Sequence, residues 1–194
     1  MSNDLSIENR ESALVITFTN PETRNPLSSS VLERLHEIVD AAGQKGVIFT
    51  GSENGFASGA NLREIAALTH ETAPGFALRG QSLMSKIEAL PGMTIAAING
   101  FCFGGALDLA LACERRIASP ESRFAHPGAG LGIITGWGGT QRLPRLIGRG
   151  RALEMFFTAE PIGAYAALQM GLVDELSADP MARASGLVTQ HALV

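Results

Sequence analysis

The sequence predicts an α/β fold, because short apolar runs typical of strands alternate with amphipathic segments typical of helices. One arrangement occurs twice: the buried strands expected at 47–50 and 94–98 each lead into a glycine-rich loop and then into a helix. Repeated units of this kind predict right-handed β–β–α turns. A length of 194 residues suits a single domain. We expect that domain to span 1–194, with 1–173 as its core and 174–194 as a short C-terminal tail.

The first elements have local signals of their own. Two alternating apolar runs, at 5–8 and 13–19, predict a pair of strands. Ser30 and Glu33 have the spacing of a capping box, in which the two side chains bond to backbone amides at a helix start. They therefore predict a helix over 31–42.

The later elements are read from periodicity and from helix-stopping residues. Pro91-Gly92 ends a long amphipathic segment. Beyond Gly138 the pattern is mostly helical, and residues 179–194 have no clear periodicity. The further elements expected in chain order are a helix over 73–90, a helix over 106–113, a strand over 116–119, a helix over 163–170 and a strand over 171–173.

Composition excludes several classes of function. Apolar residues make up 45% of the chain and charged residues 18%, which is typical of a globular protein. The net charge is −4 and no basic run interleaves with aromatic residues, so no nucleic-acid partner is expected. No apolar run is long enough to span a bilayer, and the N-terminus lacks the apolar segment of a secretory signal. We therefore expect a cytoplasmic protein with no membrane partner.

Metal and disulfide chemistry are not expected either. The two cysteines, Cys102 and Cys113, lie inside apolar stretches and lack the spacing of a zinc site or a disulfide framework.

Two glycine-rich loops, at 55–62 and 99–108, are the strongest candidates for a functional site. At a strand-to-helix junction the first amides of the helix have no intrahelical partner, and the helix dipole favours negative charge there. Such loops can stabilise an oxyanion. Tight strand–helix packing and a phosphate cradle are alternatives, although no P-loop motif is present.

Both loops resemble the oxyanion loops of the crotonase (enoyl-CoA hydratase/isomerase) superfamily. Residues 56–62, Phe-Ala-Ser-Gly-Ala-Asn-Leu, resemble the first loop of that family, and 95–108 resemble the second. The segments 24–27, Arg-Asn-Pro-Leu, 138–145 and 166–173 resemble further family motifs in the family's order.

The resemblance implies a spiral of β–β–α turns that lacks most of the usual C-terminal helical extension. It also implies a homotrimer or a hexamer built as a dimer of trimers. The implied substrate is an acyl-CoA thioester, so CoA enters with the substrate, and no separate cofactor or metal is expected. By the resemblance, Ala60 and Gly105 donate backbone N–H groups to the thioester oxygen. The positions implied to bind CoA are Arg24, Ala60, Asn61, Leu62, Arg63 and Gly105.

The chain departs from the family's hydratases at one of their two glutamate positions. Asp108 stands at the first and keeps a carboxylate, whereas Gly128 stands at the second. Two carboxylates add water together by general acid–base catalysis, so a single one favours isomerisation over hydration. Gly128 is expected to open space, as in the family's naphthoate synthases, where bicarbonate is thought to replace the carboxylate.

His126 is a candidate for a second catalytic group. If strand geometry persists beyond Phe124, residues 124, 126 and 128 face the same side and the imidazole reaches the vacated volume. Alternatively, His126 is hydrogen-bonded to backbone, and Pro127 breaks the alternation. Asp108 could similarly be only a favourable contact with the helix dipole, and Trp137 either walls the acyl group or packs under the following helix.

The leading hypothesis is therefore an isomerase or lyase of enoyl-CoA hydratase/isomerase type, active in fatty acid metabolism, with Asp108 as its acid–base group. A catalytically silent acyl-CoA-binding or scaffolding subunit is one alternative. The other is a different crotonase reaction, such as decarboxylation or ring formation, that uses the space at Gly128.

Overall fold

The fold is built on a six-stranded sheet with a smaller sheet beside it, and the computed structural model describes residues 4–53 and 55–192. The large sheet has the order β1-β2-β4-β7-β9-β12, and only its β1–β2 pair is antiparallel. These strands are β1 (Leu5–Asn9), β2 (Ala13–Phe18), β4 (Gly46–Gly51), β7 (Thr94–Ile98), β9 (Arg115–Ala118) and β12 (Glu175–Leu176).

The smaller sheet has the order β11-β10-β8-β5, and a separate two-stranded parallel pair joins β3 to β6. These strands are β3 (Pro26–Leu27), β5 (Gly55–Ala57), β6 (Gly59–Ala60), β8 (Phe101–Phe103), β10 (Arg123–Ala125) and β11 (Ile162–Gly163). In three successive turns the first strand joins the large sheet and the second joins the small one: β4 and β5, β7 and β8, β9 and β10. The predicted spiral of β–β–α turns is thereby confirmed.

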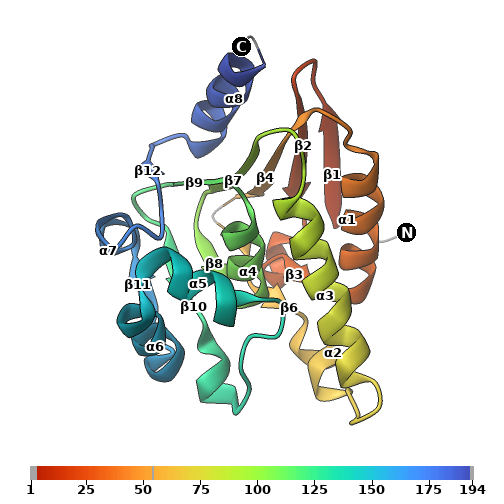
Figure 1. The fold of residues 1–194 in the computed structure, drawn as a ribbon, viewed down its shortest axis with the longest axis vertical. Coiled ribbons are helices and arrows are strands. Elements are labelled where there is room, and N and C mark those ends of the chain that lie inside the picture. The colour runs from red at the N-terminus through yellow and green to blue at the C-terminus, as the bar shows by residue number, and fades with distance from the viewer. Residues whose placement is uncertain (1–3, 54, 193–194) are drawn as a thin grey trace.

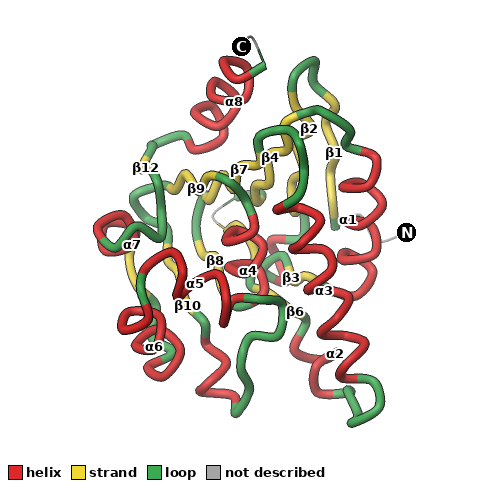
Figure 2. The backbone as a smooth tube through the Cα atoms, viewed as in Figure 1, coloured by secondary structure: helices red, strands yellow, loops and turns green. Residues whose placement is uncertain are grey.

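Helices surround this spiral, and α4 runs through its centre (Figures 1 and 2). They are α1 (Ser29–Ala41), α2 (Leu62–Ala66), α3 (Ala73–Glu88), α4 (Gly105–Ala112), α5 (Gly139–Ile147), α6 (Arg149–Thr158), α7 (Ala164–Gln169) and α8 (Pro180–His191), with 3-10 turns at Pro21–Thr23 and Pro127–Leu131. All eight residues of α4 are buried, which fits its near-continuous apolar sequence. No helix in the described part of the chain is long and apolar enough to cross a membrane.

The alternation of side chains along each strand divides the core between the two faces of the large sheet. In β7, Ala96 and Ile98 belong to the main core with α1, α3 and α4, whereas Ile95 and Ala97 belong to a second cluster on the other face. That second cluster is completed by Ala184 and Val188 of α8. Figure 1 shows α8 at one end of the molecule, apart from α1 and α3.

The structure corrects the expectation for 179–194, because α8 occupies most of this segment. Its periodicity is hard to recognise because only a narrow stripe, Pro180, Ala184 and Val188, is buried. Asp179 caps the helix by accepting a hydrogen bond from the amide of Ala182. Leu193 and Val194, the end of that segment, lie outside the described residues.

Two further local predictions are wrong. Ser28, not Ser30, caps α1 by accepting a hydrogen bond from Val31, and Glu33 instead pairs with an arginine of α3. The strand expected at 171–173 is absent, because the amides of Leu172 and Val173 both bond back to α7. A strand of the large sheet follows only at β12.

Candidate active site

The two glycine-rich loops lie against each other at the N-terminus of α4. Gly59 has a φ of +93°, and a Cβ there would lie 2.5 Å from the carbonyl oxygen of Phe103 and 2.8 Å from the amide nitrogen of Gly105. The amide nitrogen of Ala60 lies 3.3 Å from the position a Cβ on Gly105 would occupy. Gly105 is the first residue of α4, so its N–H has no intrahelical acceptor. The structure thus places the two predicted oxyanion donors, Ala60 and Gly105, next to each other.

A cavity of about 210 Å³ opens at these amides. Asp108 and His126 also line it. Among the described residues that line it, Asp108 is the only carboxylate and there is no lysine or arginine. Most of the remaining wall is apolar, from Leu62, Ile65, Leu68, Phe76, Ala77, Leu131, Ile133, Ile134 and Trp137.

Asp108, in the first turn of α4, has no exposed surface. Its Oδ2 accepts hydrogen bonds from the Thr135 hydroxyl and from the Trp137 amide at 3.3 Å, whereas Oδ1 has no hydrogen-bond partner among the described residues. Burial raises the pKa of Asp108 to about 7, against the lowering effects of the hydrogen bonds from Thr135 and Trp137, of the Arg142 charge and of the nearby Gly139 amide. Asp108 is therefore able to gain and lose a proton near neutral pH, as an acid–base catalyst must.

His126 lies beside the Asp108 carboxylate, but the predicted strand geometry is not what places it there. Strand β10 ends at Ala125 and a 3-10 turn starts at Pro127, so the strand alternation assumed for residues 124, 126 and 128 does not continue. The ring nevertheless lies with Nε2 3.6 Å from Asp108 Oδ1, and it packs against Phe156 at a centroid distance of 5.1 Å.

The electrostatics of His126 identify it as a neutral imidazole. Burial lowers the pKa of His126 to about 4, so its contact with Asp108 is not an ion pair at neutral pH. Neither ring nitrogen has a hydrogen-bond partner among the described residues, which contradicts the alternative of a backbone-bonded histidine.

Gly128 does not open the expected space. A Cβ on Gly128 would lie 2.6 Å from the carbonyl oxygen of Ile133, and the Gly128 carbonyl accepts a hydrogen bond from the Ile133 amide at 3.0 Å. The backbone of Ile133 thus fills the place where a side chain at 128 would begin. The prediction of a vacated volume at this position is wrong.

Trp137 both packs under a helix and lines the cavity. Its indole is buried between α3 and α4, where a side chain at Gly80 or at Gly105 would overlap it. Phe76 contacts it at a centroid distance of 5.5 Å. Glycine at 80 and 105 is therefore required by the tryptophan that forms one wall of the cavity.

The positions implied to bind CoA are divided between the cavity and the surface. Ala60, Leu62 and Gly105 line the cavity. Asn61 caps α2 by accepting a hydrogen bond from the Arg63 amide at 3.0 Å. Arg24 and Arg63 are exposed and do not line the cavity, so their contact with a CoA nucleotide stays a prediction.

Two contributors to the site were not anticipated from the sequence. Thr135 donates to Asp108 from the loop between the 3-10 turn and α5 (Figure 2), and Gly139 leaves room for Oδ1, which a Cβ there would overlap. The loop covers Asp108, and its end residues Gly132 and Gly138 have φ values of +70° and +108°. No local pattern indicates these contacts, because each joins residues about 30 positions apart.

Comparison with known proteins agrees with this geometry. The family model for "Enoyl-CoA hydratase/isomerase" matches residues 8–187. A "Probable enoyl-CoA hydratase" of Bacillus subtilis is 42% identical over 176 residues, which cover 88% of this chain and 68% of the relative. A "Short-chain-enoyl-CoA hydratase" of Clostridium acetobutylicum is 37% identical, with 90% of this chain and 69% of the relative covered.

Solved structures give the same assignment. The crystal structure of an enoyl-CoA hydratase from Bacillus anthracis superposes with a TM-score of 0.91 at 34% sequence identity, covering 98% of this chain and 77% of that one. The chain belongs to the enoyl-CoA hydratase/isomerase family and has the crotonase fold.

Proposed function

We propose that this chain isomerises the double bond of an enoyl-CoA thioester through an enolate held by the amides of Ala60 and Gly105. The observation that carries the proposal is one buried carboxylate, with a pKa of about 7, lining the same cavity as two adjacent amides. The names of the relatives support the enoyl-CoA substrate class, and the absence of a second carboxylate among the described residues lining the cavity supports isomerisation over two-carboxylate hydration.

The reaction uses one proton and no cofactor other than the CoA of the substrate. The ionised Asp108 removes a proton from the α-carbon of a 3-enoyl thioester, and the electron pair moves to the thioester oxygen. The Ala60 and Gly105 amides donate to that oxygen, and each such donor contributes roughly 3–4 kcal/mol in other enzymes. The dienolate then takes the proton back from Asp108 at the γ-carbon, which gives the 2-enoyl thioester.

The loop over Asp108 has a consequence for this reaction. Because Asp108 has no exposed surface, the loop between Gly132 and Gly138 must move for the α-carbon to reach Oδ1. The left-handed glycines at both ends allow such a movement.

The test is proton NMR with 3-enoyl-CoA in deuterated buffer. We expect deuterium uptake at the α- and γ-carbons together with bond migration, and a loss of both by about 10²–10⁴-fold in Asp108→Ala while acyl-CoA binding remains. Asp108→Asn is the matched variant, because it keeps the shape and the acceptor for Thr135. Unchanged turnover in either variant would contradict the role of Asp108.

A catalytically silent acyl-CoA-binding or scaffolding subunit is the second candidate, and the enclosed position of Asp108 favours it. It predicts acyl-CoA binding without proton exchange in the wild-type protein, so the same NMR experiment separates the two. The third candidate, a decarboxylation or ring formation that uses space at Gly128, loses its structural support because Ile133 fills that space.

We also propose a cytoplasmic homotrimer or hexamer acting in fatty acid metabolism. Large apolar side chains on α6 and α7 support self-association, since Phe157 is 77% and Tyr165 is 66% exposed. Light scattering coupled to gel filtration measures the mass directly, and a monomer of 20.4 kDa would contradict the assembly.

A further inference from the structure

Two buried polar atoms face each other in the cavity without hydrogen-bond partners among the described residues. They are Oδ1 of Asp108 and Nε2 of His126, 3.6 Å apart, and Nδ1 of the same ring is also unpaired. His126 is only 3% exposed, and an unpaired polar group at such a depth is destabilising because it gives up its hydrogen bonds to water. Buried polar groups that stay unpaired call for a functional explanation.

The spacing lets one water oxygen, placed beside the pair and not between its two atoms, contact both groups. A normal hydrogen bond is about 2.8 Å long, and the two atoms are separated by less than twice that length, so a single oxygen can contact both. Oδ2 is already held by Thr135 and Trp137, so Oδ1 is the oxygen left for proton transfer. Water reaches this position by the same loop movement as the substrate.

We propose that His126 is a second catalytic residue, which together with Asp108 adds water to a 2-enoyl-CoA thioester in place of the missing carboxylate. The proposal rests on the proposed function, because it uses the same enolate site. It assigns to this site a hydration that a single carboxylate does not support.

The step balances with one water and no other reactant. The water oxygen bonds to the β-carbon while one of its protons passes to Nε2 of the neutral His126. The electron pair of the double bond moves through the enolate to the α-carbon, which takes the proton of the protonated Asp108. The imidazolium then returns its proton across the 3.6 Å gap to the Asp108 carboxylate, and both groups are restored.

The charges around the pair favour these starting states. Burial disfavours the ionised form of each group, so it raises the pKa of Asp108 to about 7 and lowers that of His126 to about 4. Arg142 is the positive charge that acts on Asp108, and the charge of Asp108 in turn adds to the raised pKa of the buried Cys102 thiol, which burial raises most. At pH 6 the pair is therefore mostly a neutral acid beside a neutral base.

The first test compares two reactions in the same protein. Hydration is followed with crotonyl-CoA as the loss of the conjugated enoyl absorbance, and isomerisation with a 3-enoyl-CoA in deuterated buffer. His126→Gln keeps a hydrogen-bonding atom near the Nε2 position but cannot take up a proton. We expect the ratio of hydration to isomerisation to fall by about 10²-fold in His126→Gln and likewise in His126→Asn.

A matched control is His36→Gln on α1, whose ring nitrogen lies 3.0 Å from the Arg79 carbonyl, away from the cavity. We expect its ratio to equal that of the wild type. An unchanged ratio in a folded His126→Gln variant overturns the catalytic role of His126. Isomerisation without any hydration in the wild type also overturns it but leaves the proposed function intact, whereas the absence of both reactions refutes the proposed function itself.

The second test needs no variant. Hydration requires the proton on Asp108 and isomerisation requires the carboxylate, so raising the pH through about 7 should lower the first rate and raise the second. Parallel pH profiles for the two reactions would show that they use the same protonation state, and the proposal would then be wrong.

Discussion

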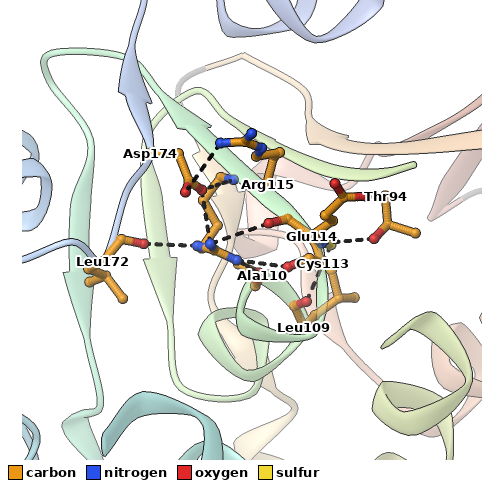
Figure 3. A network of polar contacts seen from close by, with 9 residues as sticks. Thr94, Leu109, Ala110, Cys113, Glu114, Arg115, Leu172 and Asp174 are labelled. Atoms are coloured by element: carbon orange, nitrogen blue, oxygen red, sulfur yellow. Dashed lines mark hydrogen bonds and ion pairs between the residues drawn. The ribbon is translucent and has the colours of Figure 1, made fainter. Parts of the chain in front are cut away.

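The two ends of helix α4 carry buried polar clusters of opposite character. At its C-terminal end, Arg116 of β9 is 5% exposed and all three of its guanidinium nitrogens have partners. It donates to the carbonyls of Leu172 and Cys113 at 3.0 and 2.7 Å and to the Asp174 carboxylate at 2.9 Å. Figure 3 shows Leu172, Cys113 and Asp174 with dashed lines that converge on the same side chain. At the N-terminal end, Asp108 and His126 retain unpaired atoms.

This difference distinguishes a structural cluster from the candidate catalytic one. Arg116 satisfies the free carbonyls at the end of α4 and ties them to the segment after α7, so each of its guanidinium nitrogens already has a partner within the protein. Asp108 and His126 are equally buried, but Oδ1 of Asp108 and both ring nitrogens of His126 keep unused hydrogen-bonding capacity beside a cavity that both residues line. Burial alone therefore does not mark a candidate catalytic residue, whereas burial with unpaired atoms beside a cavity favours one.

The largest expected effect comes from a substitution that disrupts the fully hydrogen-bonded cluster around Arg116. Arg116→Met removes the donors to four backbone carbonyls and leaves Asp174 without its closest cation, so we expect a loss of about 3 kcal/mol in the free energy of unfolding. Urea denaturation measures it. Arg115→Met is the control, because Arg115 approaches the same aspartate at 3.9 Å but its side chain is 53% exposed, and we expect less than about 1 kcal/mol. Equal losses would contradict the contrast between the two arginines.

A second prediction uses the opposite pKa shifts at the reactive end. The raised pKa of Asp108 means that the native state binds its proton more tightly than the unfolded state between pH 3.8 and about 7, so this group lowers stability as the pH rises through that window. His126, with its pKa lowered from 6.5 to about 4, raises stability as the pH rises between those values. In the wild type, the two contributions to stability therefore change in opposite directions as the pH rises.

Single variants should expose the two slopes separately. When the pH is raised from 4.5 to 6.5, the Tm of Asp108→Asn should rise, because only the His126 contribution remains. Over the same range the Tm of His126→Gln should fall, because only the Asp108 contribution remains. Each change should be roughly 2 kcal/mol, or about 5 °C. Scanning calorimetry at both pH values is the measurement. Slopes of the same sign in the two variants would contradict the assigned shifts.

The smallest effect concerns the anchor of Asp108. Thr135→Val removes a hydrogen bond that lowers the pKa of Asp108, so that pKa should rise further. At pH 7 we expect proton exchange to slow by about fivefold and its pH profile to move to higher pH. Thr140→Val, at the second residue of α5, tests a threonine that does not donate to Asp108. A profile that keeps its midpoint in Thr135→Val would show that this hydroxyl does not tune the acid.

Local sequence signals predicted most of the elements and part of the site. Strand and helix periodicity placed β4, β7, α3 and α4 within about two residues, because these elements bury a clear apolar face. Residues 59 and 104 have positive φ values that glycine adopts without strain, so the two glycine-rich loops could be recognised from the sequence. Their resemblance to one family also predicted the spiral.

Features that depend on contacts between residues far apart in the sequence could not be predicted from the sequence. The stripe on α8 is too narrow to identify a helix without the sheet face that it covers. Gly128 looked like open space, because the sequence does not show that the Ile133 backbone fills it.

The sequence by itself determined the fold class, the two glycine-rich loops and the presence of one carboxylate at Asp108, since these depend on residue type and on neighbours along the chain. Only the tertiary structure decided the protonation of that carboxylate and its partners. Thr135, His126 and Gly139 come to Asp108 from segments 18 to 31 residues away, and the burial that shifts both pKa values exists only once those segments pack together.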